Sequence, residues 1–387
     1  MDASLTLSAL ALGALAVAAP AAHRRLLLSR AKHRSLAGHS RIARRLAGWM
    51  PGFAYDDADF FAADAAPADV QRQRRDGFVR LAALLRERHG TSIAMTQRAR
   101  ASISDLQFTA AYRVPFPFSA YLRQHISIGN FVRSADGVTV TDLDGQRLLD
   151  ATGSYGVNLF GVDFYRACID EGVALVRELG PVLGAYHPCV LSNVERIKRI
   201  SGQDEVSFHM SGTEAVMQAV RLARYHTGRS RVVRFCGAYH GWWDDVQPGP
   251  GNPLPQTRTY TLKEMDERTL RVLASRRDIA CVLVNPLQGL HPNAAAPGDS
   301  ALVDSARRAS FDRAAYTAWL SRLRDVCSAR GIVLILDEVF MGFRLAPGGA
   351  QDYFGIRADM VTYGKTLGGG LPVGVLCGKA RWMKRFR

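Results

Sequence analysis

The sequence predicts an α/β protein in which a mostly parallel, mixed sheet is flanked by helices. Short, continuous apolar runs recur in the second half of the chain, at residues 232–235, 279–284, 332–336, 360–362 and 373–377. Stretches with helical periodicity lie between these runs, among them residues 214–226 and 314–330. Uniformly apolar strands that alternate with helices are typical of a parallel sheet with both faces covered.

The first third of the chain has a different texture. Residues 69–89 place apolar side chains at helical spacing, which predicts a long helix. After residue 130, two short β-like runs and an Asp144-Gly145 turn predict short strands joined by a turn. The predicted organisation is a hydrophobic segment at 1–22, a basic helical extension at 23–105, the lead-in and first part of a small domain at 106–165, and a large domain at 166–387.

The net charge of +15 is concentrated near the N-terminus, where eight Lys and Arg residues but no acid lie between Asp2 and Asp56. No zinc-finger or aromatic-basic RNA motif accompanies them, so we expect no nucleic-acid partner. The six cysteines are widely spaced and form no metal-type cluster. They predict reduced thiols in an intracellular protein and no metal site.

Residues 5–22 form an apolar, Ala-rich run near the lower length limit for crossing a bilayer. No cation precedes this run, which disfavours a cleaved secretory signal. If it spans a membrane, the cations that follow place the main body in the cytoplasm. We expect a cytoplasmic body, with a membrane anchor at residues 5–22 as one alternative; a peripheral helix and a misassigned start codon are the others.

A first candidate for ligand binding is the MSGTE stretch at residues 210–214, directly before a predicted helix that Gly228 ends. Free N–H groups and the positive end of the helix dipole meet there, and Ser211 and Thr213 add hydroxyl donors. This combination suits a phosphate group. An ordinary N-cap is the alternative, since Ser and Thr are common at that position.

Two further candidates follow predicted strands. Tyr239 lies in a GAYHG stretch, where its ring could stack on a planar ligand; a buried core tyrosine is the alternative. Asp337 ends an apolar strand, at the edge of the sheet where ligands bind in open α/β folds. A carboxylate at this edge can pair with a protonated pyridine nitrogen, and Val339 can pack on a ring face.

Lys365 ends a short predicted strand and enters a loop with three glycines at 368–370. Glycines let the backbone approach a bound group closely. A lysine near a cationic or apolar site loses its proton more readily and becomes a nucleophile for an aldehyde. A P-loop is excluded, because its glycines precede the lysine whereas here they follow it.

In their order and spacing these elements resemble the class III aminotransferases, which are fold type I pyridoxal-phosphate enzymes. Within that family the chain is most similar to the glutamate-1-semialdehyde aminomutase branch. The resemblance runs from about residue 130 to the end. The matching motifs are SGTEA at 211–215, YHG at 239–241, DEV at 337–339, GFR at 342–344, and Lys365 with GGG at 368–370 and Pro372. Residues 153–156 and 348–355 are aminomutase-like.

The resemblance implies a fold type I large domain with pyridoxal 5'-phosphate as the cofactor. It implies that Lys365 forms the internal aldimine, a Schiff base, and then moves a proton between substrate and cofactor carbons. Asp337 is implied to pair with the pyridinium nitrogen, between Tyr239 on one ring face and Val339 on the other. The other implied contacts are Ser211, Gly212, Thr213 and His240 for the cofactor, and Ser154 and Tyr155 for the substrate. Arg123, just before the matching region, is a further candidate for a substrate carboxylate; an ordinary surface arginine is the alternative.

The chain departs from the family pattern at three places. Met210 stands where an Asn is usual, and Asn285 stands where the family has a Glu before Pro286. Family members also continue past the equivalent of Arg387 into a C-terminal small domain. That domain completes the active site in a homodimer, so we expect an incomplete small domain here and a homodimer for the full-length protein.

Three functional hypotheses stay open. The chain is an aminotransferase for a small-molecule amino donor and a keto acceptor, or an aminomutase that moves the amino group within one molecule. The third hypothesis is a truncated, catalytically inactive homologue attached to a membrane. The presence of both Lys365 and Asp337 favours the two enzymes.

Overall fold

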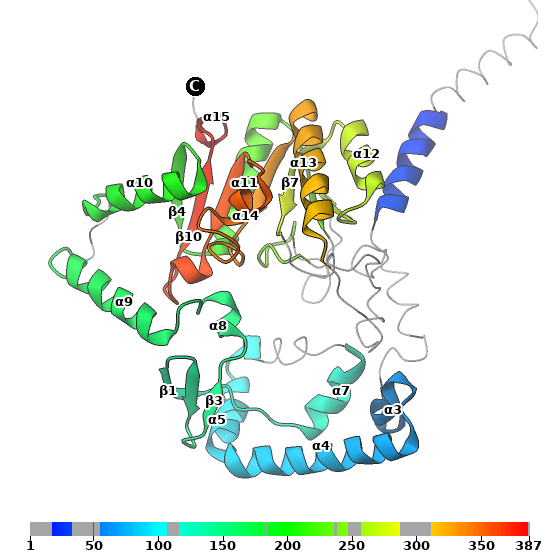
Figure 1. The fold of residues 1–387 in the computed structure, drawn as a ribbon, viewed down its shortest axis with the longest axis vertical. Coiled ribbons are helices and arrows are strands. Elements are labelled where there is room, and N and C mark those ends of the chain that lie inside the picture. Colours follow the sequence, from blue (N-terminus) through cyan, green and yellow to red (C-terminus); the bar gives the residue numbers. More distant parts are fainter. Residues whose placement is uncertain are drawn as a thin grey trace, which may run out of the picture. The chain divides into compact units, whose positions relative to one another are not determined.

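The structure is a computed structural model, and it describes residues 18–32, 49, 55–106, 116–180, 182, 184–235, 238–246, 257–286 and 311–385. The chain forms two compact units (Figure 1). The sheet unit comprises the described residues within 18–32, 184–286 and 311–385. The helical unit comprises the described residues within 49–182.

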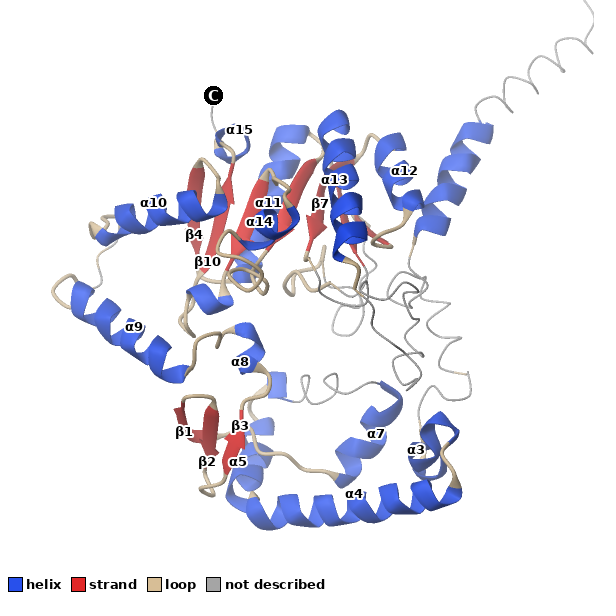
Figure 2. Ribbon diagram, in the orientation of Figure 1, coloured by secondary structure: helices blue, strands red, loops and turns tan. Residues whose placement is uncertain are grey.

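The sheet unit is built on a sheet with the strand order β4-β10-β9-β8-β7-β5-β6 (Figure 2). The strands are β4 (Glu205–His209), β5 (Arg231–Phe235), β6 (Thr259–Leu262), β7 (Ile279–Val284), β8 (Val333–Asp337), β9 (Met360–Tyr363) and β10 (Gly374–Gly378). Neighbouring strands from β9 to β6 pair in parallel, whereas β10 is antiparallel to both of its neighbours. The predicted mostly parallel, mixed sheet is therefore confirmed.

Helices cover both faces of this sheet. Strand side chains that point to opposite faces therefore enter two separate apolar cores. In β7, Leu283 belongs to the core under α11 (Gly212–Thr227), whereas Val282 and Val284 belong to the other core. That second core also contains side chains from several other helices. Among them are α10 (Cys189–Ser201), α12 (Glu267–Ser275), α13 (Arg313–Arg330) and α14 (Gly349–Phe354). A strand buried on both faces has no reason to alternate with polar residues, which explains the continuous apolar runs.

A helix of residues 18–31 opens the described part of the sheet unit. Ala31 is fully buried in the core, and Lys32 forms a β-bridge with Leu262 on the edge strand β6. Of the predicted anchor, residues 5–17 lie outside the described residues. Within the ranges that are described, no helix has the length and apolar character needed to cross a membrane.

Where the structure describes it, the helical unit joins α-helices to a three-stranded antiparallel sheet, β1-β2-β3 (Figure 1). Its described elements are α3 (Asp57–Ala62), α4 (Ala68–Arg88), α5 (Gly90–Arg100), α7 (Phe116–His125), β1 (Val132–Asp136), β2 (Thr139–Asp142), β3 (Arg147–Leu149), α8 (Gly153–Gly156) and α9 (Val162–Val176). The long helix predicted at residues 69–89 corresponds to α4, and the predicted short strands correspond to β1–β3, which pair antiparallel.

Two acids around the β2–β3 turn join this sheet to the helices before it. The Asp144 carboxylate accepts hydrogen bonds from the N–H groups of Thr91 and Ser92 at the start of α5, at 2.8 and 2.9 Å. Asp142 Oδ2 lies 2.5 Å from Nδ1 of His89, at the junction of α4 and α5. Acceptors placed at a helix start satisfy N–H groups that have no partner within the helix.

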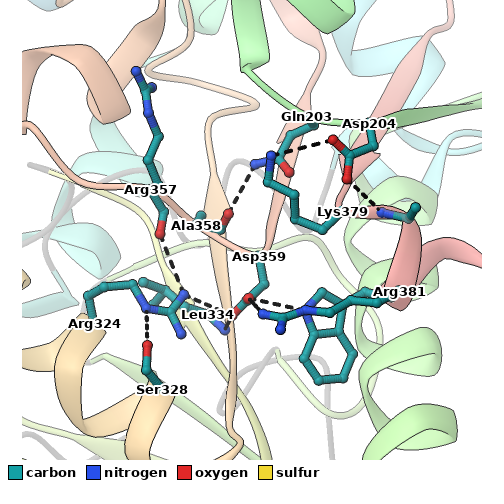
Figure 3. Close-up of polar contacts among 12 residues, drawn as sticks. Gln203, Asp204, Arg324, Ser328, Leu334, Arg357, Ala358, Asp359, Lys379 and Arg381 are labelled. Atoms are coloured by element: carbon teal, nitrogen blue, oxygen red, sulfur yellow. Dashed lines mark hydrogen bonds and ion pairs between the residues drawn. The ribbon is translucent and has the colours of Figure 1, made fainter.

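Asp359 forms a second polar centre, at the amino ends of the strands in the sheet unit (Figure 3). This carboxylate is buried and accepts hydrogen bonds from the Leu334 N–H, the guanidinium groups of Arg324 and Arg381, and the Trp382 indole. Burial alone would raise the pKa of Asp359, but the Leu334 N–H and Arg324 outweigh it and hold the pKa below its ordinary value. The contacts connect β8, α13 and α15 (Ala380–Met383).

We predict that Asp359→Asn lowers the free energy of unfolding in urea by about 3 kcal/mol, because it removes the charge that compensates Arg324 in a buried site. Since the pKa is lowered in the folded state, this stabilisation is present above the unfolded pKa of about 4. It is lost as the pH falls through the folded value.

The matched control is Asp352→Asn, which removes an exposed ion pair with Arg357. Exposed pairs contribute less than about 1 kcal/mol. Equal losses in the two variants would contradict the assignment of Asp359 as the stabilising centre.

Candidate active site

The amino end of α11 follows directly from β4 and is held by a local hydrogen-bond pair. The Ser211 hydroxyl caps the helix by accepting the Glu214 N–H at 3.2 Å. In return, the Glu214 carboxylate accepts the N–H of Met210 at 2.8 Å. The N–H groups of Gly212 and Thr213 come first in the helix, so they have no acceptor within it. Such an end can bind an anion through backbone donors and the helix dipole.

Two glycines allow close packing around this helix end. A Cβ atom on Gly212 would lie 2.7 Å from Cγ1 of Val339, and one on Gly241 would lie 2.7 Å from Oγ1 of Thr213. Gly241 also has a φ of 95°, in the region that favours glycine. The residues that follow β8 and β5 therefore lie directly against the start of α11.

Asp337 lies at the carboxyl end of β8 and is 1% exposed. Its Oδ1 accepts hydrogen bonds from the Val339 N–H at 3.1 Å and from the Thr362 hydroxyl at 3.2 Å. Its Oδ2 lies 2.7 Å from Nδ1 of His240, which is also buried. Among the described residues, Oδ2 has this one donor, and a carboxylate oxygen can accept a second.

Lys365 begins the short turn η4 (Lys365–Leu367), two residues after the end of β9. Its φ of 45° lies in the left-handed region, which is unusual for a residue with a side chain. Burial lowers the pKa of the Lys365 amine; the negative charge of Asp337 opposes this effect and the positive charge of Arg344 adds to it. The net lowering leaves a larger share of the amine unprotonated and nucleophilic.

Tyr239 lies in the segment after β5 and is 51% exposed. The Asn285 amide donates to its carbonyl oxygen at 3.0 Å, and the buried Arg234 donates to the carbonyl of Ala238 at 3.1 Å. Burial of the phenol, with the charge of Asp337, raises the pKa of Tyr239, so the ring stays neutral. Gly237, also part of the GAYHG motif, lies outside the described residues.

These side chains line one cavity of about 170 Å³. All eight cofactor-binding candidates named from the sequence lie in its wall: Ser211, Gly212, Thr213, Tyr239, His240, Asp337, Val339 and Lys365. Sequence reasoning missed Val216 and Phe340, and it noted Asn285 only as a departure from the family pattern. Their positions next to the SGT, DEV and strand-end motifs were the available signal.

The three predicted substrate contacts belong to the helical unit. Ser154 and Tyr155 lie in α8 with left-handed φ angles of 48° and 56°, and the Ser154 hydroxyl donates to Asp150 at 2.6 Å. Arg123 is exposed on α7. The contacts of Ser154, Tyr155 and Arg123 with a substrate stay predictions.

The sheet, with the cavity at its carboxyl edge, has the architecture of the fold type I pyridoxal-phosphate transferases. A solved transaminase with pyridoxal phosphate bound is 29% identical, with a TM-score of 0.58 that covers 77% of this chain and 66% of that one. An omega-transaminase from Sphaerobacter thermophilus is 27% identical, with a TM-score of 0.58 that covers 76% and 65%. The family profile of the class-III aminotransferases matches residues 120–245 and 311–387, and the chain belongs to this family.

Curated relatives agree with this family. Glutamate-1-semialdehyde 2,1-aminomutase of Citrifermentans bemidjiense is 33% identical over 301 residues, which are 71% of this chain and 64% of the relative. The aminomutase of Alkaliphilus oremlandii is 33% identical over 300 residues, 72% and 66% of the two chains. The chain thus spans less than two thirds of the length of these relatives. Pyridoxal phosphate is the cofactor of the family.

We predict that Gly212→Ala lowers the free energy of unfolding by roughly 1–3 kcal/mol, because the added methyl group overlaps Val339. Combining it with Val339→Ala should restore part of this loss, because the second substitution removes the overlapping atoms. Urea unfolding of the two single variants and the double variant measures the coupling. Strictly additive losses would show that the two residues do not compete for the same space.

Proposed function

We propose that this chain carries the cofactor-binding domain of a pyridoxal-phosphate-dependent aminotransferase that acts on small-molecule amino and keto compounds. One observation carries the proposal. A lysine with a lowered pKa, a buried carboxylate and an open helix end line the same cavity of the sheet unit. These are the three groups that an aldehyde, a pyridine nitrogen and a phosphate require.

The described residues fit the cofactor. The first N–H groups of α11, with the hydroxyls of Ser211 and Thr213, provide donors for the phosphate. Gly212 leaves that approach free of a side chain. Asp337 Oδ2 has room for a further donor, which a protonated pyridine nitrogen supplies. Tyr239, half exposed at the cavity, is available to lie on the ring.

When bound, the cofactor supplies an electron sink for the bond broken at the substrate carbon. Asp337 would pair with the ring nitrogen of the cofactor, and His240 and Thr362 hold Asp337 in place. Lys365 would hold the cofactor through its amine. The same amine would be the group in this cavity that accepts and returns a proton during the reaction. Val339, packed on Gly212, limits the space on one side of the cavity.

An aminomutase is the second candidate, supported by the curated relatives at 33% identity. The solved structures at 27–29% identity are transaminases. The two reactions differ in whether the amino group leaves with a second substrate. An assay of product formation with and without an added amino acceptor separates them, since only the transaminase needs the acceptor for continued turnover.

A homodimer is part of the proposal, and three exposed apolar side chains support it. Met210, Trp242 and Leu371 are 64%, 71% and 57% exposed, and each lies close in sequence to residues of the cavity wall. Exposed apolar side chains that gather in a patch mark protein interfaces. We expect sedimentation to show a dimer, and we expect Trp242→Glu to weaken this dimer. A monomeric wild-type chain would contradict an interface made by Met210, Trp242 and Leu371.

We predict that the purified chain binds added pyridoxal phosphate with yellow absorbance, and that borohydride fixes the cofactor on Lys365. The physical reason is the unprotonated amine that the lowered pKa provides. Peptide mass spectrometry locates the added mass. Lys365→Ala should abolish fixation, whereas Lys379→Ala, which removes a lysine paired with Asp204, should not affect it.

A wild-type chain that stays colourless with added cofactor would contradict both enzyme hypotheses for this chain. It would favour the inactive homologue instead. Fixation on another lysine, with Lys365 unmodified, would overturn the assignment of Lys365 but leave cofactor binding intact.

A further inference from the structure

The connection between β8 and α14 (Gly349–Phe354) is a tightly held loop beside Lys365. The Gly342 N–H donates to the carbonyl oxygen of Glu338 at 2.8 Å, and a Cβ atom on Gly342 would lie 2.7 Å from that oxygen. At the other end, the N–H of Ala350 donates to the buried Glu338 carboxylate at 2.8 Å. Glu338 therefore holds the loop at both ends.

This loop carries a cation toward the candidate active site. Arg344 donates from Nε to the carbonyl oxygen of Phe340 at 2.8 Å, and its Cζ lies 5.0 Å from the centroid of the Phe340 ring. The Nζ of Lys365 lies 5.8 Å from the centroid of the same ring. Phe343, between the two loop residues, has a φ of 66°, a strained conformation that only a fixed surrounding maintains. Arg344 and Lys365 thus both lie near the ring of Phe340, and the hydrogen bond to the Phe340 carbonyl holds Arg344 there.

Among the described residues, two charged groups act on the proton of Lys365 together with the burial of the amine. Burial disfavours the charged amine, the Asp337 carboxylate favours it, and the Arg344 guanidinium disfavours it. His240 hydrogen-bonds the same carboxylate, and Tyr239, with its raised pKa, stays neutral. A guanidinium is a delocalised, permanently charged cation. The ring of Phe340 can attract a cation, and the Arg344 guanidinium already lies 5.0 Å from its centroid.

We propose that Arg344 is a positioning residue for the chemistry at Lys365: its fixed charge offsets Asp337 and favours the uncharged, nucleophilic amine. The proposal rests on the proposed role of Lys365 as the amine that holds the cofactor. It assigns a function to the GFR motif that the cofactor contacts leave unexplained, because Arg344 does not line the cavity.

The test measures the reactivity of the Lys365 amine itself, in the full chain from which cofactor has been removed with hydroxylamine. Trinitrobenzenesulfonate modifies only unprotonated amines, and peptide mass spectrometry reports the rate at Lys365 as a function of pH. We expect Arg344→Gln to raise the midpoint of this profile by roughly half to one pH unit. At a fixed pH below the midpoint, modification becomes roughly three- to tenfold slower.

Arg344→Lys keeps the charge and should keep the midpoint close to that of the wild type. Arg322→Gln removes the same charge from the exposed surface of α13, where Arg322 pairs with Glu267, and should leave the profile unchanged. Arg344→Met serves if the Gln variant does not fold. The proposal would be overturned if Arg344→Gln and Arg344→Met had the same modification midpoint at Lys365 as the wild type. It would also be overturned if Arg344→Lys shifted this midpoint as much as Arg344→Gln does. Because no cofactor takes part, these outcomes are independent of whether pyridoxal phosphate binds.

Discussion

The candidate active site depends on how one buried charge, the carboxylate of Asp337, is satisfied. Removing a carboxylate from water costs several kcal/mol unless hydrogen bonds replace the lost hydration. The donors come from three different segments: the turn after β8, Thr362 on β9 and His240 after β5. Placing this charge therefore also fixes the relative positions of three strand ends. The segment that carries Tyr239 and the strand that leads to Lys365 are held by the same bonds.

The sheet topology explains why these segments can meet. Strands β5, β7, β8 and β9 run in parallel, so their carboxyl ends lie at one edge. The antiparallel β10 brings Gly374 so close to the carbonyl of Ser211 that no side chain fits there, which seats the start of α11 against the sheet. At the opposite edge, Asp359 connects β8 to α13 and α15. Asp337 lines the cavity, whereas Asp359 stabilises the sheet.

Much of this arrangement could be predicted from the sequence, where local pattern and motif order agree. Strand β7 has the predicted limits, 279–284, because an apolar strand buried on both faces leaves an unbroken signal. The edge strand β6, with the sequence TYTL, was not predicted because it mixes polar and apolar residues. The contacts of Thr362 and Arg344 were also missed. They depend on side chains that come together only in the folded chain, and neither has a local signature. Glu338 follows Asp337 directly, just beyond the end of β8, yet it does not line the cavity. Successive side chains of an extended chain point to opposite sides, and the Glu338 carboxylate binds the N–H of Ala350 in the next loop.

The proposed role of Asp337 is to hold the ring nitrogen of the cofactor in its protonated form. The most direct test is ¹⁵N NMR of the chain loaded with pyridoxal phosphate that is labelled at this nitrogen. We expect the chemical shift of a protonated pyridine nitrogen in the wild-type chain, and that of an unprotonated nitrogen in Asp337→Asn. An unprotonated nitrogen in the wild-type chain, or the same shift in both proteins, would contradict it.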